Sequence, residues 1–136
     1  MPAESDAELR EILGFETIAV VGCSSTPGKD AHDVPAYLRN QGYEVVPVNP
    51  YAEEIFGRTA YDSLADVAEE IDIVNVFRPS EEVSGIVDDA VARDDVRVVW
   101  TQLGISDTAA ARRAEDAGKT VVQDRCMKVE HERLVG

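Results

Sequence analysis

The sequence predicts an α/β fold of the doubly wound, Rossmann-like class, built on one parallel sheet of five strands. Short apolar runs rich in Val and Ile alternate with amphipathic stretches of helical periodicity, which is typical of consecutive βαβ units. The first run, 17–21, leads into a polar loop at 22–29 and then into a helical pattern, as in sheets that bind anions at a helix amino terminus. With 136 residues and no repeat or linker, residues 1–136 are expected to form a single domain.

The strands are expected where β-branched residues dominate, in short runs that end at turn residues. These runs are 17–21, 43–48, 71–77, 96–101 and 120–123. Pro50 follows the second run and Pro79 the third, and proline cannot donate to the hydrogen-bond ladder of a central strand. With right-handed crossovers, the predicted order of the strands across the sheet is 3-2-1-4-5.

The helices are predicted from apolar residues three and four apart and from capping residues. They cover 6–13, 33–41, 63–70, 80–92, 106–117 and 127–134. The second has the clearest ends, since Asp33 can cap its start, Pro35 suits its first turn and Gly42 can end it. The segment 51–61 is expected to be an irregular connection.

The composition is strongly acidic and excludes several classes of protein. The net charge is −14, and ten of the 13 basic residues are arginine, a balance similar to that of salt-adapted archaeal proteins. An ordinary acidic bacterial protein is the alternative. The chain has no basic stripe for nucleic acid and no apolar run of about 18 residues to span a membrane. The acidic start lacks a signal peptide's apolar core and two cysteines make no disulfide framework, so a cytoplasmic location is expected.

The loop at 22–29 fits neither of two familiar phosphate-binding motifs. A P-loop has four residues between its glycines and Ser or Thr after its lysine, whereas Gly22 and Gly28 enclose five residues and Asp30 follows the lysine. The dinucleotide fingerprint needs two further glycines that are missing here, and Asn49 stands where that fingerprint has an acid. The loop therefore predicts an anionic ligand and argues against ATPase and ordinary NAD chemistry.

Basic residues gather at the carboxyl ends of the predicted strands. Ligands of open α/β sheets bind outside these ends, and Lys29, Arg78 and Arg125 all fall there. In an otherwise acidic protein, this local positive charge favours an anionic ligand. The alternative is that the two arginines pair with nearby acids, such as Glu81 and Asp124, and serve only stability.

Six sequence blocks in a recognisable order make the chain similar to a known family. They are VVGCSS with PGK at 20–29, VPAYL at 34–38, GYEVVPVNP at 42–50, DIVNVFRP at 72–79, WTQLGI at 100–105 and DRCMKVEH at 124–131. In these blocks the chain resembles the stand-alone CoA-binding domain proteins. These are relatives of the CoA-binding domain of succinyl-CoA synthetase and NDP-forming acyl-CoA synthetases. The resemblance covers roughly residues 16–134.

The resemblance implies a CoA site at the carboxyl edge of the sheet. The residues expected at the phosphates lie in the first loop: Gly22, Ser24, Ser25, Pro27 and Lys29. Those expected to flank the adenosine follow the second and third strands: Asn49, Pro50, Phe77, Arg78 and Pro79. Those expected along the pantetheine arm follow the fourth strand: Gln102, Leu103 and Gly104. An arginine suits a phosphate because its planar fork of donors can bind two oxygens, and Arg125 adds charge at the same edge.

No catalytic residue or metal ligand is assigned. The related synthetases use a phosphorylated histidine in a following domain, so their ligase chemistry is not carried over to a chain with only His32 and His131. Cys23 and Cys126 do not stand at standard metal-ligand spacings from these histidines. The prediction is binding of CoA or acyl-CoA, with a homodimer or an acyl-CoA enzyme as possible partner. Two alternatives stay open: a small reductase or transferase with a nucleotide cofactor, and a subunit that presents CoA to an acyl-CoA-handling complex.

Overall fold

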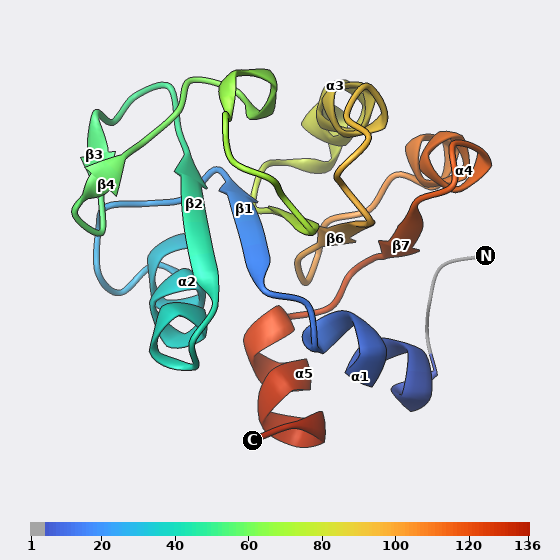
Figure 1. The fold of residues 1–136 in the computed structure, drawn as a ribbon, viewed down its shortest axis with the longest axis horizontal. Coiled ribbons are helices and arrows are strands. Elements are labelled where there is room, and N and C mark those ends of the chain that lie inside the picture. The colour runs from blue at the N-terminus through green and yellow to red at the C-terminus, as the bar shows by residue number, and fades with distance from the viewer. Residues whose placement is uncertain (1–4) are drawn as a thin grey trace.

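The computed structural model describes residues 5–136, and its centre is a parallel sheet of five strands (Figure 1). In chain order these are β1 (Thr17–Val21), β2 (Glu44–Val48), β5 (Ile73–Val76), β6 (Val98–Thr101) and β7 (Thr120–Val122). Every neighbouring pair runs parallel, which confirms the predicted fold class. Residues 1–4 lie outside the described residues. They belong to the acidic start of the chain, which is part of the basis for expecting a cytoplasmic location.

Helices cover both faces of the sheet (Figure 1). One face carries α1 (Asp6–Leu13), α2 (Asp30–Asn40) and α5 (Met127–Leu134), and the other carries α3 (Ser80–Val91), α4 (Thr108–Asp116) and the 3-10 helix η1 (Leu64–Asp66). Alternate strand residues enter the two cores, so Ile18 and Val20 pack on the first face while Ala19 and Val21 pack on the second. Both faces are buried, which is why the strands read as continuous apolar runs. Within residues 5–136, no helix is long and apolar enough to cross a membrane.

The predicted strand order is wrong at one point. The observed order is β2-β1-β5-β6-β7, so the third main strand pairs with β1 instead of lying outside β2. The reason is in β2 itself. The Pro47 carbonyl accepts the Tyr61 amide (3.1 Å) at the outer side of β2, so this residue turns its backbone outward, where it has no N–H to donate. A strand with proline facing outward must be an edge strand, and the chain returns to the other side of β1.

The outer side of β2 is closed by short contacts instead of a further strand. The Asn49 amide donates to the Tyr61 carbonyl (2.8 Å), and Arg58 Nη1 donates to the Val45 carbonyl (3.0 Å). Arg58 also pairs with the carboxylates of Glu44 and Glu69. The charged Arg58 therefore sits on the backbone groups that an added strand would need.

The connection after β2, predicted to be irregular, holds a small antiparallel hairpin. Its strands are β3 (Glu54–Ile55) and β4 (Arg58–Thr59), with Ile55 opposite Arg58. Phe56 and Gly57 form the two-residue turn, and both have positive φ, +56° and +73°. Such turns usually carry Asn and Gly, because a bulky residue is strained there, so Phe56 concealed the hairpin in the sequence.

The helix predicted at 63–70 is reduced to the single turn of η1. Arg93, two residues after the end of α3, donates to three carbonyl groups of this segment: Leu64 (3.0 Å), Val67 (2.8 Å) and Glu69 (2.9 Å). Asp95 fixes the same guanidinium with two further hydrogen bonds, and its pKa is lowered to about 2, chiefly by Arg93. The long-range bonds to Arg93 replace the helical hydrogen bonds that local sequence alone would favour.

Candidate functional site

The carboxyl ends of β1 and β5 approach each other closely at the point where the strand order reverses. Gly22 follows β1 with φ +89°, a conformation that glycine adopts readily. A Cβ at this position would lie 2.8 Å from Arg78 Cδ and 3.2 Å from the Phe77 carbonyl carbon. Glycine is therefore required both for the turn and for the passage of the segment after β5. Ligands of doubly wound sheets bind at this switch point.

A pocket of about 260 Å³ opens beside this crossing, between the ends of β1, β2 and β5 and the side of α3. Its floor is apolar and its rim is polar; the floor residues are Val21, Val48, Leu64 and Ile86. Four of the predicted site residues contribute to the pocket: Gly22, Asn49, Pro50 and Arg78. The sequence did not single out its remaining members, Tyr51, Asp62, Ser63, Glu82 and Asp89. Tyr51 is 91% exposed at the rim. It directly follows Pro50, a predicted site residue, and this position in the sequence could have indicated that Tyr51 also lines the pocket.

Arg78 is the basic residue of this pocket, and it already has a partner. Its Nε and Nη2 donate to the two carboxylate oxygens of Glu82 at 3.2 Å and 2.7 Å. The hydrogen bond from Arg78 holds the pKa of Glu82 below its usual value. The sequence alternative named Glu81 as partner, but Glu82 stands four residues from Arg78 and faces the same side.

The rest of the rim is acidic. Asp62 and Asp89 line the pocket beside the Arg78–Glu82 pair. The pKa of Asp89 is raised, first by desolvation and then by the nearby charges of Asp88 and Asp66. The apolar floor suits the flat, uncharged base of a nucleoside. On this otherwise acidic rim, Arg78 is the group that could meet a phosphate, in competition with Glu82.

Asn49 joins the ends of β1 and β2. Its Nδ2 donates to the Cys23 carbonyl (2.8 Å), and its Oδ1 accepts the Tyr51 amide (2.8 Å). An aspartate could not make the first of these bonds, because a carboxylate has no proton to donate. This explains why an amide stands where the dinucleotide fingerprint has an acid.

The predicted phosphate loop lies on the α2 side of the same edge. Ser25, Pro27 and Lys29 are exposed. Lys29 directly precedes α2, and its side chain makes no capping hydrogen bond. Helix α2 starts at Asp30, three residues earlier than predicted, because Asp33 accepts the Gly28 amide (3.0 Å) instead of capping the helix. Ser24 is partly buried and its hydroxyl accepts the Thr26 amide (3.0 Å). An uncapped helix start beside a lysine is a suitable place for phosphate oxygens.

The residues after β5 and β6 turn the chain into their helices. Phe77 is partly buried against the α2-side core, and Pro79 precedes the first residue of α3. Gln102 is buried, and its Oε1 accepts the Met127 amide (3.0 Å) at the start of α5. Gly104, with φ +84°, donates its amide to Asp124 Oδ1 (2.5 Å).

Arg125 forms an ion pair with Glu130 of α5, which in turn pairs with a second arginine. Its Nη1 lies 3.0 Å from Glu130, a largely buried carboxylate that also pairs with Arg133 (2.9 Å). The Arg125 carbonyl accepts the indole N–H of the buried Trp100 (2.8 Å). Asp124, the partner named from sequence, has φ +57° and directs its carboxylate to Gly104 instead. Arg125 therefore lies at the edge but is directed toward α5.

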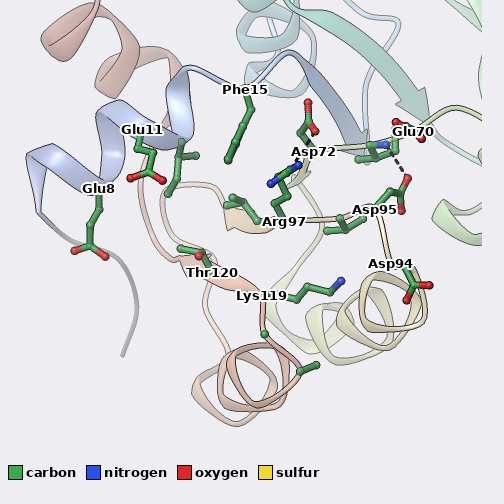
Figure 2. Close-up of a pocket in the computed structure, with 16 residues that line it drawn as sticks. Glu8, Glu11, Phe15, Glu70, Asp72, Asp94, Asp95, Arg97, Lys119 and Thr120 are labelled. Atoms are coloured by element: carbon green, nitrogen blue, oxygen red, sulfur yellow. Dashed lines mark hydrogen bonds and ion pairs between the residues drawn. The ribbon is translucent and has the colours of Figure 1, made fainter.

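A wider concavity of about 820 Å³ lies at the opposite edge, at the amino ends of β5, β6 and β7. Figure 2 shows acidic side chains around Arg97 and Lys119 in this region. Several of the acids have structural roles. Asp72 accepts the Glu16 and Thr17 amides at 3.1 Å each, and Asp95 accepts the Ile71 amide (2.8 Å). The acidic lining is unsuited to a phosphorylated ligand.

The two histidines are separately engaged. His32 Nδ1 lies 2.8 Å from the Ser24 carbonyl oxygen, and His131 Nδ1 lies 2.8 Å from the Tyr37 hydroxyl. Among residues 5–136, no group of three or more His, Cys, Asp or Glu side chains is arranged to hold a metal ion. Cys23 and Cys126 are both free thiols, and burial raises the pKa of Cys23 to about 12.

The fold and this edge define a doubly wound α/β protein with a pocket of about 260 Å³ at its switch point. The chain belongs to the CoA-binding domain family, whose sequence model matches residues 16–132. This confirms the resemblance that the six sequence blocks carry.

Three comparisons show how the chain relates to other proteins. The uncharacterized protein YneT of Bacillus subtilis is 40% identical over 132 residues, which cover 96% of this chain and 97% of YneT. A hypothetical protein from Pyrococcus horikoshii OT3 has a solved structure with TM-score 0.94 and 39% identity, covering 100% of this chain and 97% of that one. The ADP-forming acetate–CoA ligase of Methanocaldococcus jannaschii is 31% identical over 84 residues. That match spans 62% of this chain and 12% of the ligase, so the chain is homologous to a small part of that enzyme.

Proposed function

We propose that this protein binds CoA or an acyl-CoA at the carboxyl edge of its sheet. The observation that carries the proposal is the pocket at the switch point, in a chain of the CoA-binding domain family. The loop that follows β1 at the same edge leads to the start of α2, which has no side-chain cap. The adenosine occupies the slot between Asn49–Pro50 and Arg78. The diphosphate lies at the loop that carries Ser25 and Lys29, and the pantetheine arm runs toward Gln102 and Gly104.

The proposal is limited to binding and includes no ligase chemistry. His32 and His131 are each hydrogen-bonded within the fold. Dinucleotide reductase chemistry is disfavoured, because Asn49 clamps the strand ends where a ribose-binding acid would stand. A cytoplasmic location stays part of the proposal, in keeping with the two free cysteines.

A second candidate function is the presentation of CoA to an acyl-CoA-handling partner. It is favoured by Leu103, which is 71% exposed in the loop proposed to line the pantetheine arm. Val129 on α5 is 53% exposed. Large apolar side chains near the reactive end of the ligand would suit contact with a partner or with a second copy of this chain.

Calorimetric titration with CoA, dephospho-CoA and NAD at one salt concentration tests the proposal. We expect CoA to bind with micromolar or tighter affinity and NAD to bind more weakly. Dephospho-CoA should also bind more weakly, because a cation at the site then lacks the 3′-phosphate. Equal affinity for the three ligands would contradict a site that is specific for CoA, and mass spectrometry of natively purified protein would identify any acyl group.

A further inference from the structure

Ser24, at the base of the proposed phosphate loop, is attached to the first turn of α2. Its amide donates to the Ala31 carbonyl (2.9 Å). That carbonyl is available because Pro35, four residues further along the helix, has no N–H to donate. The helix thus gives up one internal hydrogen bond, and the loop takes the vacant acceptor.

His32 supplies the second attachment. Its Nδ1 lies 2.8 Å from the Ser24 carbonyl oxygen. A carbonyl oxygen only accepts, so Nδ1 must carry the proton in this contact. Both backbone groups of Ser24 are therefore held by the first turn of α2. The exposed residues from Ser25 to Lys29 continue from this fixed base.

Phe56 holds the imidazole from the other side. The two rings have centroids 4.9 Å apart with their planes at 36°, and the Arg39 guanidinium lies 4.8 Å from the centre of the same phenyl ring. Phe56 makes these contacts from the strained turn of the β3–β4 hairpin, where φ is +56°. In Figure 1 the chain after β1 runs past this hairpin before it enters α2. The hairpin also continues the segment of Pro50 and Tyr51, which lines the adenosine pocket.

We propose that His32 is a positioning residue for the diphosphate of the bound nucleotide. By holding the Ser24 carbonyl, it fixes the loop so that Lys29 and the first amides of α2, which have no side-chain cap, meet the phosphate oxygens. Phe56 holds His32 in that orientation. The inference rests on the proposed binding of CoA. Its physical basis is preorganisation, since a loop that is already ordered loses less conformational entropy when the ligand binds.

Two matched variants separate this role from simple packing. In His32→Asn the amide nitrogen replaces Nδ1 and can still donate to Ser24. In His32→Gln the amide lies one carbon further out, near the position of Nε2. Both variants are polar. Glutamine has the higher helix propensity, so weaker binding in His32→Gln would not follow from a less stable helix. Each is titrated with CoA, with ADP and with adenosine, which lacks phosphates. Phe56→Leu, which removes the aromatic contact but keeps an apolar side chain, is titrated in the same way.

We expect His32→Gln to weaken CoA and ADP about tenfold and to leave adenosine unchanged, because only the phosphates contact the loop. His32→Asn should restore most of the affinity, and Phe56→Leu should lose about threefold. Unchanged CoA affinity in His32→Gln, or an equal loss for adenosine, would overturn the role of His32. Wild-type protein that does not bind CoA at all would refute the proposed function instead, so the two failures are distinguishable.

Discussion

At the scale of single residues, the Arg78–Glu82 pair decides how the proposed site meets a phosphate. The pair is half-exposed, and exposed ion pairs contribute only about 0–1 kcal/mol to stability. A charge-assisted bond to phosphate contributes more, about 1.5–3 kcal/mol. The phosphate can therefore compete for Arg78, but it must first displace the carboxylate of Glu82.

Glu82→Gln should raise the affinity for CoA several-fold. The variant removes the charge that competes for Arg78 and reduces the negative charge of the rim formed with Asp62 and Asp89. Calorimetry at low and moderate salt would measure the change, which should shrink as salt screens the charges. If Glu82→Gln instead weakens binding, then the carboxylate contacts the ligand directly.

Arg78→Ala is the matched control for this prediction. It should weaken CoA roughly ten- to a hundred-fold while changing the free energy of unfolding by less than about 1 kcal/mol. Arg78→Lys should recover only part of the loss, because lysine lacks the planar fork of donors. Unchanged affinity in Arg78→Ala would leave Arg78 as a surface residue only.

Gly22→Ala should destabilise the protein far more than alanine at an equivalent glycine. Gly22 and Gly118 have almost the same φ, +89° and +88°, but a Cβ at Gly118 would meet nothing within 4 Å. Backbone strain alone should cost Gly118→Ala about 1–2 kcal/mol. Gly22→Ala adds the clash with Arg78 and Phe77 and should cost roughly 2–5 kcal/mol.

Urea unfolding of the two variants beside the wild type would measure this difference. Equal destabilisation of Gly22→Ala and Gly118→Ala would mean that the Arg78 side chain moves aside at no cost. The crossing of the chain at the switch point would then impose no steric requirement on Gly22.

At the scale of secondary-structure elements, α5 is fastened to α2 through a buried histidine. His131 Nδ1 lies 2.8 Å from the Tyr37 hydroxyl, and its ring meets Tyr37 and Tyr43 edge-on at 5.4 Å and 5.7 Å between centroids. Desolvation lowers the pKa of His131 below its usual value, partly opposed by the charge of Glu132. The imidazole is thus held neutral between two tyrosines.

Stability should therefore fall as the solution is acidified through the range of histidine titration. The unfolded chain takes up the His131 proton near pH 6.5, whereas the folded protein does so only at lower pH. Between these two pKa values the unfolded state binds more protons, so the free energy of unfolding rises with pH. This contribution is fully present above about pH 6.5 and is lost as the pH falls toward the folded pKa.

Urea midpoints at about pH 7.5 and 5.5 for wild type and His131→Asn would measure this contribution. Asparagine can still accept a hydrogen bond from Tyr37 but does not titrate. The loss of stability on acidification should be smaller in the variant. Identical losses would assign the pH dependence to other groups.

The elements show how far the sequence could predict the fold. The β-branched runs located the five strands, and their alternation with helices gave the parallel class. The strand order was missed because Pro47 was not recognised as a marker of an edge strand. The hairpin was missed because Phe56 occupies a turn that usually carries Asn. The helix predicted at 63–70 does not form in full, because its carbonyl groups accept hydrogen bonds from Arg93, which is distant in the sequence. Each miss reflects tertiary contacts that override local preference.

The sequence could predict the edge of the sheet at which the candidate site lies, but not which side chains form its pocket. The carboxyl ends of parallel strands must gather at one edge, so Gly22, Asn49 and Arg78 could be expected together. Side-chain directions were not available from spacing alone. Arg125 therefore proved to face α5 and Glu130, and the acids of the rim were not anticipated.

At the scale of the whole molecule, charge is the dominant feature. With a net charge of −14, repulsion between acids should destabilise the folded state most when salt is low. The thermal midpoint should therefore rise as KCl increases from about 0.1 M to about 3 M. Calorimetric scans across this range would test the prediction of salt adaptation, and a flat or falling midpoint would count against it.

The closure of β2 has a consequence for how copies of this protein can meet in concentrated solution. An open strand edge can pair with the edge of another chain and start aggregation. Here Arg58 covers the Val45 carbonyl, Pro47 offers no amide, and the Tyr61 segment occupies the remaining positions. The opposite edge is β7, which is only three residues long. Continuous sheets across molecules are thus disfavoured at both ends, so we expect lasting contact between copies to use helical faces or the proposed ligand edge.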